Sequence, residues 1–248
     1  MQCYIPGCAD HRGACAITVI VTGTSEVSCF GGNDGSAGIT VSGGTGPYLF
    51  QWTGNVTGYT SGSEDPINLV ADTYDLTVTD NHGCIEFFDD LVIIDQPDDL
   101  VVTVDLITPV ECHGEATGAV EITPSGGTPP YSFSWSGPGG FSSSAEDISG
   151  LESGTYSLTF TDSRGCMKEF LNLATVLESG PITAFFTVTG VSCSGGTDGA
   201  IDVAVSGGTP DYDYDWNGPF PFTSTLEDIS NLVAGFYILR VTDAAGCM

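Results

Sequence analysis

The sequence predicts an all-β protein made of three tandem β-sandwich domains. Short runs of alternating apolar and polar residues are separated by turns rich in Gly, Pro and Ser, as is typical of antiparallel strands. The 248 residues include 34 glycines and 13 prolines, and no helical period is sustained. The same pattern recurs three times at a spacing of about 80 residues, which suits small domains that each have a core.

Each copy contains the same landmarks in the same order. A first cysteine is followed by a Gly-Gly-Thr turn, an aromatic strand that ends in Trp, and a closing Thr-Asp-x-x-Gly-Cys turn. The interval from the first cysteine to the tryptophan is 23 residues in every copy (52 − 29, 135 − 112 and 216 − 193). We therefore expect a cysteine-containing N-terminal extension at residues 1–16 and domains at residues 17–97, 98–180 and 181–248.

The aromatic strand follows the Gly-Gly-Thr turn. Tyr48, Phe50 and Trp52 alternate with Leu49 and Gln51, so the aromatic side chains share one face of the strand. The other two copies alternate in the same way. We expect these core residues: Tyr48, Trp52, Tyr131, Trp135, Tyr212 and Trp216.

A second alternating strand precedes the closing turn. In the first copy it runs Tyr74-Leu76-Val78, and Leu69 stands five residues before the tyrosine. This arrangement resembles the tyrosine corner of immunoglobulin-like sandwiches. The predicted fold is therefore three tandem immunoglobulin-like β-sandwiches.

A final strand is predicted in only two copies. The strand-like runs 85–94 and 167–176 follow the second cysteine of the first and second copies, but the third copy stops at Cys247-Met248. A sandwich without this strand exposes an unpaired edge, which invites strand addition. Either the chain continues in the full-length protein or a neighbouring subunit donates the strand. Donation from the N-terminal extension, or from residues 17–21, would join molecules head to tail in a filament.

These landmarks together resemble the SprB-type repeat of the giant surface adhesins of gliding bacteria. The resemblance runs from about Ile17 to Cys247. It implies immunoglobulin-like repeats, export by the type IX route and an extracellular adhesive or structural role. One departure is Ala71-Asp72-Thr73-Tyr74, where the other copies have Gly154 or Gly235.

Cysteine spacing predicts one disulfide in each repeat. The two cysteines of a repeat are 55, 54 and 54 residues apart (84 − 29, 166 − 112 and 247 − 193). We expect the pairs Cys29–Cys84, Cys112–Cys166 and Cys193–Cys247, and an oxidising extracellular location. Six reduced thiols are the alternative. Zinc is disfavoured because no Cys-x-x-Cys occurs.

Three cysteines remain in the N-terminal extension: Cys3, Cys8 and Cys15. Because three is odd, at least one is unpaired or joined to another chain. Either their partner lies upstream in a longer protein, or they form an intermolecular cross-link.

The charge of the chain excludes two classes of partner. Asp and Glu number 32 against 4 Lys and Arg, a net charge of −28. Nucleic acids and anionic membranes both require a basic face. No run of 18 apolar residues is present, so we expect no membrane insertion.

The sequence contains none of the common catalytic or cofactor-binding motifs. A nucleophile elbow, a P-loop, a dinucleotide fingerprint and His-Glu-x-x-His are all absent. His82 and His113 lie beside repeat cysteines but have no counterparts in the other repeats. We expect no catalytic residues and no cofactor.

Acidic residues make calcium the remaining metal candidate. The carboxylate pairs Glu64/Asp65, Glu146/Asp147 and Glu227/Asp228 recur, which favours a turn cap over a calcium ligand. Asp211, Asp213 and Asp215 form a row on an exposed strand face, either a solvated surface or a ladder that attracts Ca²⁺. The weak calcium candidates are thus Asp211, Asp213, Asp215, Glu227 and Asp228.

The sequence also offers features for glycans. Asn55-Val56-Thr57 is a glycosylation sequon. Phe141, Phe220 and Phe222 follow the tryptophan strands and are where a glycan-binding array would have exposed aromatic side chains.

We expect a non-enzymatic protein of the bacterial cell surface. It would be a building block of an adhesin or filament, with copies of itself or neighbouring repeats as partners. A glycan- or ligand-binding array is the alternative.

Overall fold

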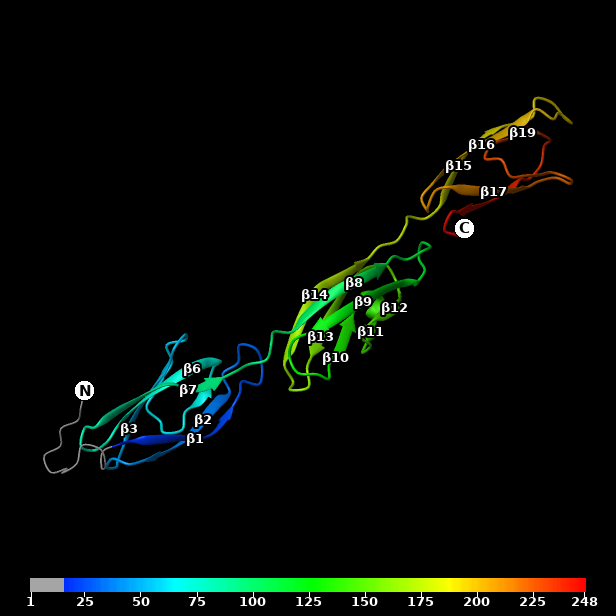
Figure 1. Ribbon diagram of the computed structural model, residues 1–248. Coiled ribbons are helices and arrows are strands. Elements are labelled where there is room, and N and C mark those ends of the chain that lie inside the picture. Colours follow the sequence, from blue (N-terminus) through cyan, green and yellow to red (C-terminus); the bar gives the residue numbers. More distant parts are fainter. Residues whose placement is uncertain (1–15) are drawn as a thin grey trace. The chain divides into compact units, whose positions relative to one another are not determined.

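The computed structural model describes residues 16–248 and confirms the all-β prediction. The described chain contains twenty strands and one 3-10 turn, η1 (Pro138–Gly140). The strands form six sheets, two for each repeat. Figure 1 shows the strands in chain order, from β1 in blue to the red C-terminal segment.

The first repeat is a sandwich of two antiparallel sheets. One sheet has the order β1-β2-β5 and the other β4-β3-β6-β7. Trp52 on β3 and Tyr74 and Leu76 on β6 are fully buried between the sheets. The strand bounds are β1 (Thr18–Ser25), β2 (Gly35–Ser42), β3 (Leu49–Gly54), β4 (Thr60–Ser61), β5 (Ile67–Leu69), β6 (Asp72–Thr79) and β7 (Ile85–Ile94).

The second repeat has the same topology. Its sheets have the orders β12-β9-β8 and β11-β10-β13-β14. Trp135 on β10 and Tyr156 on β13 take the buried places of Trp52 and Tyr74. The strand bounds are β8 (Val101–Thr108), β9 (Gly118–Ser125), β10 (Ser132–Ser136), β11 (Ser142–Ser143), β12 (Ile148–Leu151), β13 (Gly154–Thr161) and β14 (Met167–Val176).

The third repeat has six strands among the described residues, and none follows β20. Its sheets are β15-β16-β19 and β18-β17-β20, so β20 is an edge strand where β6 and β13 are central. The strand bounds are β15 (Thr183–Thr189), β16 (Gly199–Ser206), β17 (Tyr212–Asn217), β18 (Thr223–Ser224), β19 (Ile229–Leu232) and β20 (Ile238–Asp243).

The missing partner of β20 loosens the third core. Tyr74, Leu76 and Val78 on β6 are each 0% exposed. Their counterparts Tyr237 and Leu239 are only half-buried, and Val241 is 9% exposed. The other central aromatic residue, Trp216, stays buried because it packs within the two sheets that are present.

The aromatic side chains are anchored by hydrogen bonds, since a buried N–H or O–H group needs an acceptor. The Tyr74 hydroxyl donates to the Val70 carbonyl four residues earlier (2.9 Å), and Tyr156 and Tyr237 do the same with Glu152 and Val233. This is the bond expected of a tyrosine corner. The three tryptophan Nε1 groups donate to the carbonyls of Ser63, Ala145 and Leu226, each at 3.0 Å.

Of the six predicted core residues, the tryptophans are buried and the tyrosines are not fully so. Tyr48, Tyr131 and Tyr212 are half-buried. Each hydroxyl donates to the first glycine carbonyl of its Gly-Gly-Thr turn: Gly43, Gly126 and Gly207. These tyrosines therefore fasten the turn at the border of the core.

The chain forms two compact units whose limits differ from those of the repeats. The first unit runs to Val101 and also includes residues 124–131 and 161–168. The second comprises residues 102–123, 132–160 and 169–248. The closing turn of the second repeat thus belongs to the first unit. The domain limits expected from the sequence stay a prediction.

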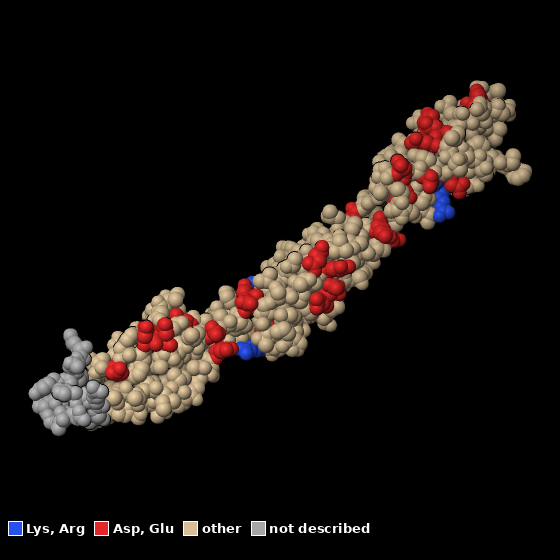
Figure 2. All heavy atoms as spheres, viewed as in Figure 1, with Lys and Arg blue, Asp and Glu red and all other residues tan. Residues whose placement is uncertain are grey.

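Acidic side chains are dispersed rather than gathered in one patch. Figure 2 shows Asp and Glu atoms at many separate places on the visible face, with Lys and Arg atoms at few. No helix among residues 16–248 has the length and apolar character to cross a membrane.

Candidate functional site

The first cysteine of each repeat lies in a short loop between two paired strands, which we call the first-cysteine loop (residues 28–34, 111–117 and 192–198). In the first repeat, the Gly32 N–H donates to the Cys29 carbonyl (2.9 Å). The Asp34 carboxylate accepts the N–H (2.9 Å) and the hydroxyl of Ser28. These bonds from Ser28, the hydroxyl first, hold the pKa of Asp34 below its ordinary value.

The same scaffold recurs in the other two loops. The Glu115 N–H donates to Cys112 (3.0 Å) and the Gly196 N–H to Cys193 (2.9 Å). In the third loop Asp198 accepts the Ser192 N–H, as Asp34 does for Ser28. In the second loop the hydroxyl of Thr117 replaces that carboxylate and accepts from Glu111. All three loops therefore present their cysteine on the same local framework.

The second cysteine closes a turn built around a buried aspartate, which we call the Asp–Cys turn (residues 80–84, 162–166 and 243–247). Asp162 is 5% exposed. One carboxylate oxygen accepts the N–H groups of Arg164 and Cys166, both at 2.9 Å. The other accepts the Thr128 N–H at 2.8 Å. The carboxylate thus ties its own turn to the Gly-Gly-Thr turn.

Asp80 and Asp243 repeat this arrangement. They accept from Cys84 and Cys247 and, across the sheet, from Thr45 and Thr209. Burial raises the pKa of Asp162, but hydrogen bonds from backbone N–H groups, those of Thr128 and Cys166 first, outweigh it, so the pKa lies below its ordinary value. The pKa values of Asp80 and Asp243 are also lowered, first by the Cys84 and Thr209 N–H groups respectively. The three carboxylates therefore serve as charged acceptors inside the fold.

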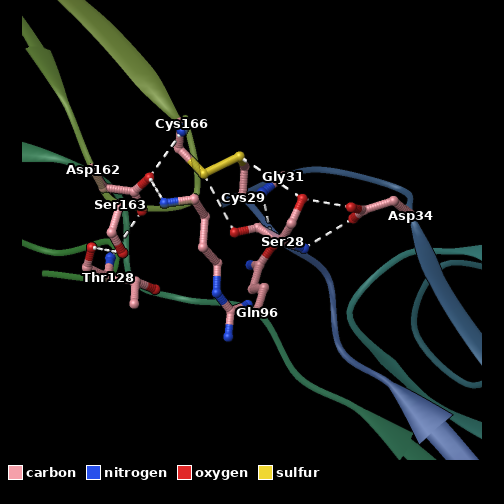
Figure 3. Close-up of a disulfide and its surroundings, with 10 residues drawn as sticks. Ser28, Cys29, Gly31, Asp34, Gln96, Thr128, Asp162, Ser163 and Cys166 are labelled. Carbon is pink, nitrogen blue, oxygen red and sulfur yellow. Dashed lines mark hydrogen bonds between the residues drawn. A yellow bond between two sulfur atoms is a disulfide. The ribbon is translucent and has the colours of Figure 1, made fainter.

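The two disulfides connect consecutive repeats. Cys29 of the first repeat is bonded to Cys166 of the second, and Cys112 of the second to Cys247 of the third. Each joins a first-cysteine loop to the Asp–Cys turn of the next repeat, with Cα atoms 5.5 and 5.4 Å apart. Figure 3 shows the first of these, with Ser28 and Asp34 on one side and Asp162 on the other.

The predicted pairs Cys29–Cys84, Cys112–Cys166 and Cys193–Cys247 are therefore wrong, as is one disulfide per repeat. The reason is the position of the two elements in a sandwich. A Cβ built on Gly44 would lie 3.1 Å from the Asp80 carboxylate and 3.2 Å from Ile17. The Asp–Cys turn thus lies at the start of β1, whereas Cys29 follows its end. Eight strand residues span about 26 Å, while a disulfide requires Cα atoms within about 7 Å.

The surroundings of the two disulfides match in detail. The Sγ atoms of Cys166 and Cys247 lie 3.3 and 3.4 Å from the carbonyl oxygens of Ser28 and Glu111. The Gly31 N–H donates to the Gln96 side chain (2.7 Å) and the Gly114 N–H to Glu178 (2.9 Å). These N–H groups belong to glycines with positive φ. The disulfide is thus one part of a repeated set of contacts.

A shallow crevice borders each disulfide. The first measures about 260 Å³ and contains the ion pair of Lys168 with Asp99 (2.6 Å). The second measures about 290 Å³ and contains His113, whose Nδ1 lies 3.4 Å from Glu178. The charged residues of the two crevices differ in kind, so they do not form a shared catalytic set.

Comparison with protein families identifies the repeated module. The family model of the SprB repeat matches residues 21–57, 105–140 and 186–219. The chain carries three SprB repeats. Each match contains a first-cysteine loop and an aromatic strand, and ends before the Asp–Cys turn. The SprB repeat is a module of surface adhesins. No curated protein matches the chain.

Two of the predicted cysteines of the SprB repeats take no part in these disulfides. Cys84 is buried within its Asp–Cys turn, and Cys193 is an exposed thiol. The predictions for Cys3, Cys8 and Cys15 lie outside the described residues.

The recurring carboxylate pairs have a structural use. One oxygen of Asp65 accepts the Ile39 N–H (2.9 Å), and Asp147 and Asp228 accept from Ile122 and Val203 in the same way. The aspartate of each pair therefore bonds to the backbone of a neighbouring strand, and the choice between a turn cap and a calcium ligand stays a prediction.

The predicted calcium candidates do not come together. Asp211, Asp213 and Asp215 are exposed around β17. Among residues 16–248, only Asp75, Asp89 and Asp90 bring three acidic groups within 4.8 Å of one another. Ser157 takes the place of Asp75 in the second repeat, where its hydroxyl accepts the Asn172 N–H as Asp75 accepts that of Asp90. This cluster is therefore particular to one SprB repeat.

The glycan candidates differ in accessibility. The Asn55 side chain donates to Asp90 (3.0 Å) and Asp75 (3.3 Å). Phe141 and Phe222 pack edge-on against Tyr156 and Tyr237. Only Phe220, 99% exposed, presents a free aromatic face among the three phenylalanines.

Sequence reasoning missed the central role of Asp80, Asp162 and Asp243. The sequence did contain a signal for this role. The motif Thr-Asp-x-x-Gly-Cys occurs in all three repeats, and its aspartate is identical in each while the two residues after it vary. An aspartate two and four residues before N–H groups in a glycine-containing turn is the pattern of an Asx-type turn.

Proposed function

We propose that this chain is a non-enzymatic structural segment of a bacterial surface adhesin, in which disulfides link consecutive SprB repeats. One observation carries the proposal: both disulfides join the first cysteine of one repeat to the second cysteine of the next. The repeated hydrogen bonds around them support a purpose common to all repeats rather than a single active site.

Such a cross-link runs in parallel with the peptide linker. Pulling on the chain ends transmits force from Cys29 directly to Cys166, so residues 30–111 are bypassed. The disulfide then bears the load in place of the linker between β7 and β8, because it limits how far that linker can be stretched. An adhesin under shear benefits because unfolding of one repeat cannot lengthen the chain freely.

The location follows from the same bonds. Disulfides persist in oxidising compartments such as the cell surface, and SprB repeats belong to surface-associated proteins. We therefore place the chain outside the bacterial cell, where its charge of −28 also keeps it soluble.

Mapping of peptides from the non-reduced protein tests the proposal. We expect Cys29 joined to Cys166 and Cys112 joined to Cys247. A Cys193→Ser variant is the control and leaves both pairs unchanged. Recovery of Cys29 joined to Cys84 would contradict the proposal.

We also propose that the third repeat is completed by a strand from a neighbouring repeat or a second copy, as in a filament. The unpaired edge of β20 and the incomplete burial of Tyr237 and Leu239 support this. Sedimentation at increasing concentration should show assemblies, and an added peptide with the sequence of residues 167–178 should disperse them by taking the edge. A monomer at every concentration would contradict strand donation between copies.

A glycan-binding array is the second candidate function, and Phe220 favours it. Its side chain is 99% exposed in the loop between β17 and β18, so its aromatic ring is accessible to a ligand. A glycan array screen with wild type and Phe220→Ala decides between the two. Binding that is lost in the variant supports a glycan site, and absence of binding supports the structural role alone.

A further inference from the structure

The first-cysteine loop of the third repeat has the scaffold of the two cross-linked loops without their partners. Its Gly196 N–H donates to Cys193, and Ser192 donates to Asp198 through its N–H at 3.0 Å. These bonds lower the pKa of Asp198, with the Ser192 hydroxyl as the largest cause. Yet Cys193 is an exposed thiol, whereas Cys29 and Cys112 are in disulfides.

Two further groups around Cys193 lack the acceptors that their counterparts have. The N–H groups of Val27 and Val110 donate to the carbonyls of Asp95 and Leu177, at the ends of β7 and β14. The N–H groups of Gly31 and Gly114 donate to Gln96 and Glu178. Within residues 16–248, the structure gives Val191 and Gly195 no corresponding acceptor.

The Cys193 thiol and the N–H groups of Val191 and Gly195 would all be satisfied by one segment of chain. In the first two repeats the acceptors follow one another along the chain: the end of the final strand, then Gln or Glu, then the next repeat with its Asp–Cys turn. We propose that the Cys193 loop accepts the Asp–Cys turn of a further SprB repeat, so that Cys193 forms the next disulfide of the series. This inference rests on the proposed function, because it extends the same cross-link by one repeat.

Disulfide formation here is a two-electron oxidation. The S–H bonds of Cys193 and of the incoming turn cysteine break, and one S–S bond forms between the two Sγ atoms. The two electrons and two protons pass to a disulfide-bearing oxidant, which is reduced to two thiols. In the test below, that oxidant is oxidised glutathione.

The experiment adds the missing partner to the full chain. Residues 1–247 are followed directly by a second copy of residues 167–248, which supplies a final strand, Glu178 and a further repeat. The appended copy carries Cys193→Ser, so only the original Cys193 remains. The two Cys247 peptides differ because only the original continues into Met167-Lys168.

After refolding with oxidised glutathione, we expect the original Cys193 to be joined to the cysteine of the appended C-terminal turn. Iodoacetamide labels Cys193 in the natural chain, and this labelling should be lost in the extended chain. A Cys193 that stays open to alkylation, or that pairs with Cys247 of its own repeat, overturns the inference.

A shorter extension separates the cross-link from strand completion. Residues 1–247 followed only by residues 167–178 receive the strand and Glu178 but no turn cysteine. We expect slower amide exchange in β20 with Cys193 still open to alkylation. Protection of Cys193 by the strand alone would contradict a role for the turn. Loss of the Cys29–Cys166 pair in the natural chain would instead refute the proposed function.

Discussion

At the scale of single residues, one buried carboxylate organises each Asp–Cys turn. Asp162 accepts three backbone N–H groups at 2.8–2.9 Å and holds Cys166 in place for the disulfide. The carboxylate is charged and almost fully covered, so its stability depends on these donors. Position and bonding explain why the same aspartate recurs in all three repeats.

Replacing this carboxylate should weaken the second repeat. Asp162→Ala leaves the Thr128, Arg164 and Cys166 N–H groups without their acceptor. We expect the free energy of unfolding to fall by on the order of 3 kcal/mol, since bonds to charged groups contribute about 1.5–3 kcal/mol each and water replaces part of them. Amide hydrogen exchange in β9, β10 and β13 measures the stability of the second repeat separately from the other two. Glu121→Gln, at an exposed position on β9, is the matched control and should change little.

The pH dependence follows from the lowered pKa of Asp162. A carboxyl whose folded-state pKa is below its unfolded value of about 3.9 stabilises the fold above that pH. The stabilisation is lost as pH falls through the folded-state pKa. The stability difference between wild type and Asp162→Asn should therefore be constant above about pH 5 and shrink below about pH 4. Thermal unfolding from pH 7 to acid measures it, and a difference that grows toward acid would contradict the assignment.

At the scale of strands, alternation predicted most of the fold. The aromatic and tyrosine-corner strands lie where their periodicity placed them, because an alternating apolar face can be buried only in a strand. The half-burial of Tyr48 could not be predicted, because its hydroxyl bonds to Gly43 at the border of the core. The role of Asp65 was left open between a cap and a calcium ligand, and its bond to Ile39 was invisible to local patterns.

Two substitutions test the strand faces. Trp135 is 1% exposed, so Trp135→Ala should cost about 3–5 kcal/mol of unfolding free energy, as for other buried aromatics. Asp213 is exposed on β17, and Asp213→Ser should leave the third repeat unchanged, since Ser132 stands at the same place in the second. Amide hydrogen exchange, followed repeat by repeat, compares the two variants, because Trp135→Ala removes the tryptophan of the second repeat. Unfolding of the third repeat by Asp213→Ser would mean that this face is not solvated.

At the scale of the whole molecule, the disulfide pattern was beyond sequence reasoning. The cysteines of one repeat are evenly spaced, but so are those of consecutive repeats, with separations of 137 and 135 residues. A periodic sequence therefore makes both pairings equally regular. Only the three-dimensional fold decides, because it puts the first-cysteine loop and the Asp–Cys turn of one repeat at different ends of β1.

The two pairings differ in how far the chain can be stretched. With cross-repeat disulfides, the shortest covalent path from Cys29 to Cys247 runs through Cys166 and back to Cys112, roughly 55 residues in place of roughly 220. Cys112→Ser removes one bypass, and the path becomes Cys29 to Cys166 and on to Cys247, roughly 80 residues.

Single-molecule pulling of the fully unfolded chain measures this path. Cys112→Ser should lengthen the maximum extension of the oxidised protein by about 90 Å, at about 3.4 Å per residue. Pairing within repeats would instead free the whole Cys112–Cys166 loop, about 180 Å. Ser194→Ala, beside the exposed Cys193, is the control and should change nothing. The gain in length therefore shows whether disulfides between consecutive SprB repeats carry the pulling force.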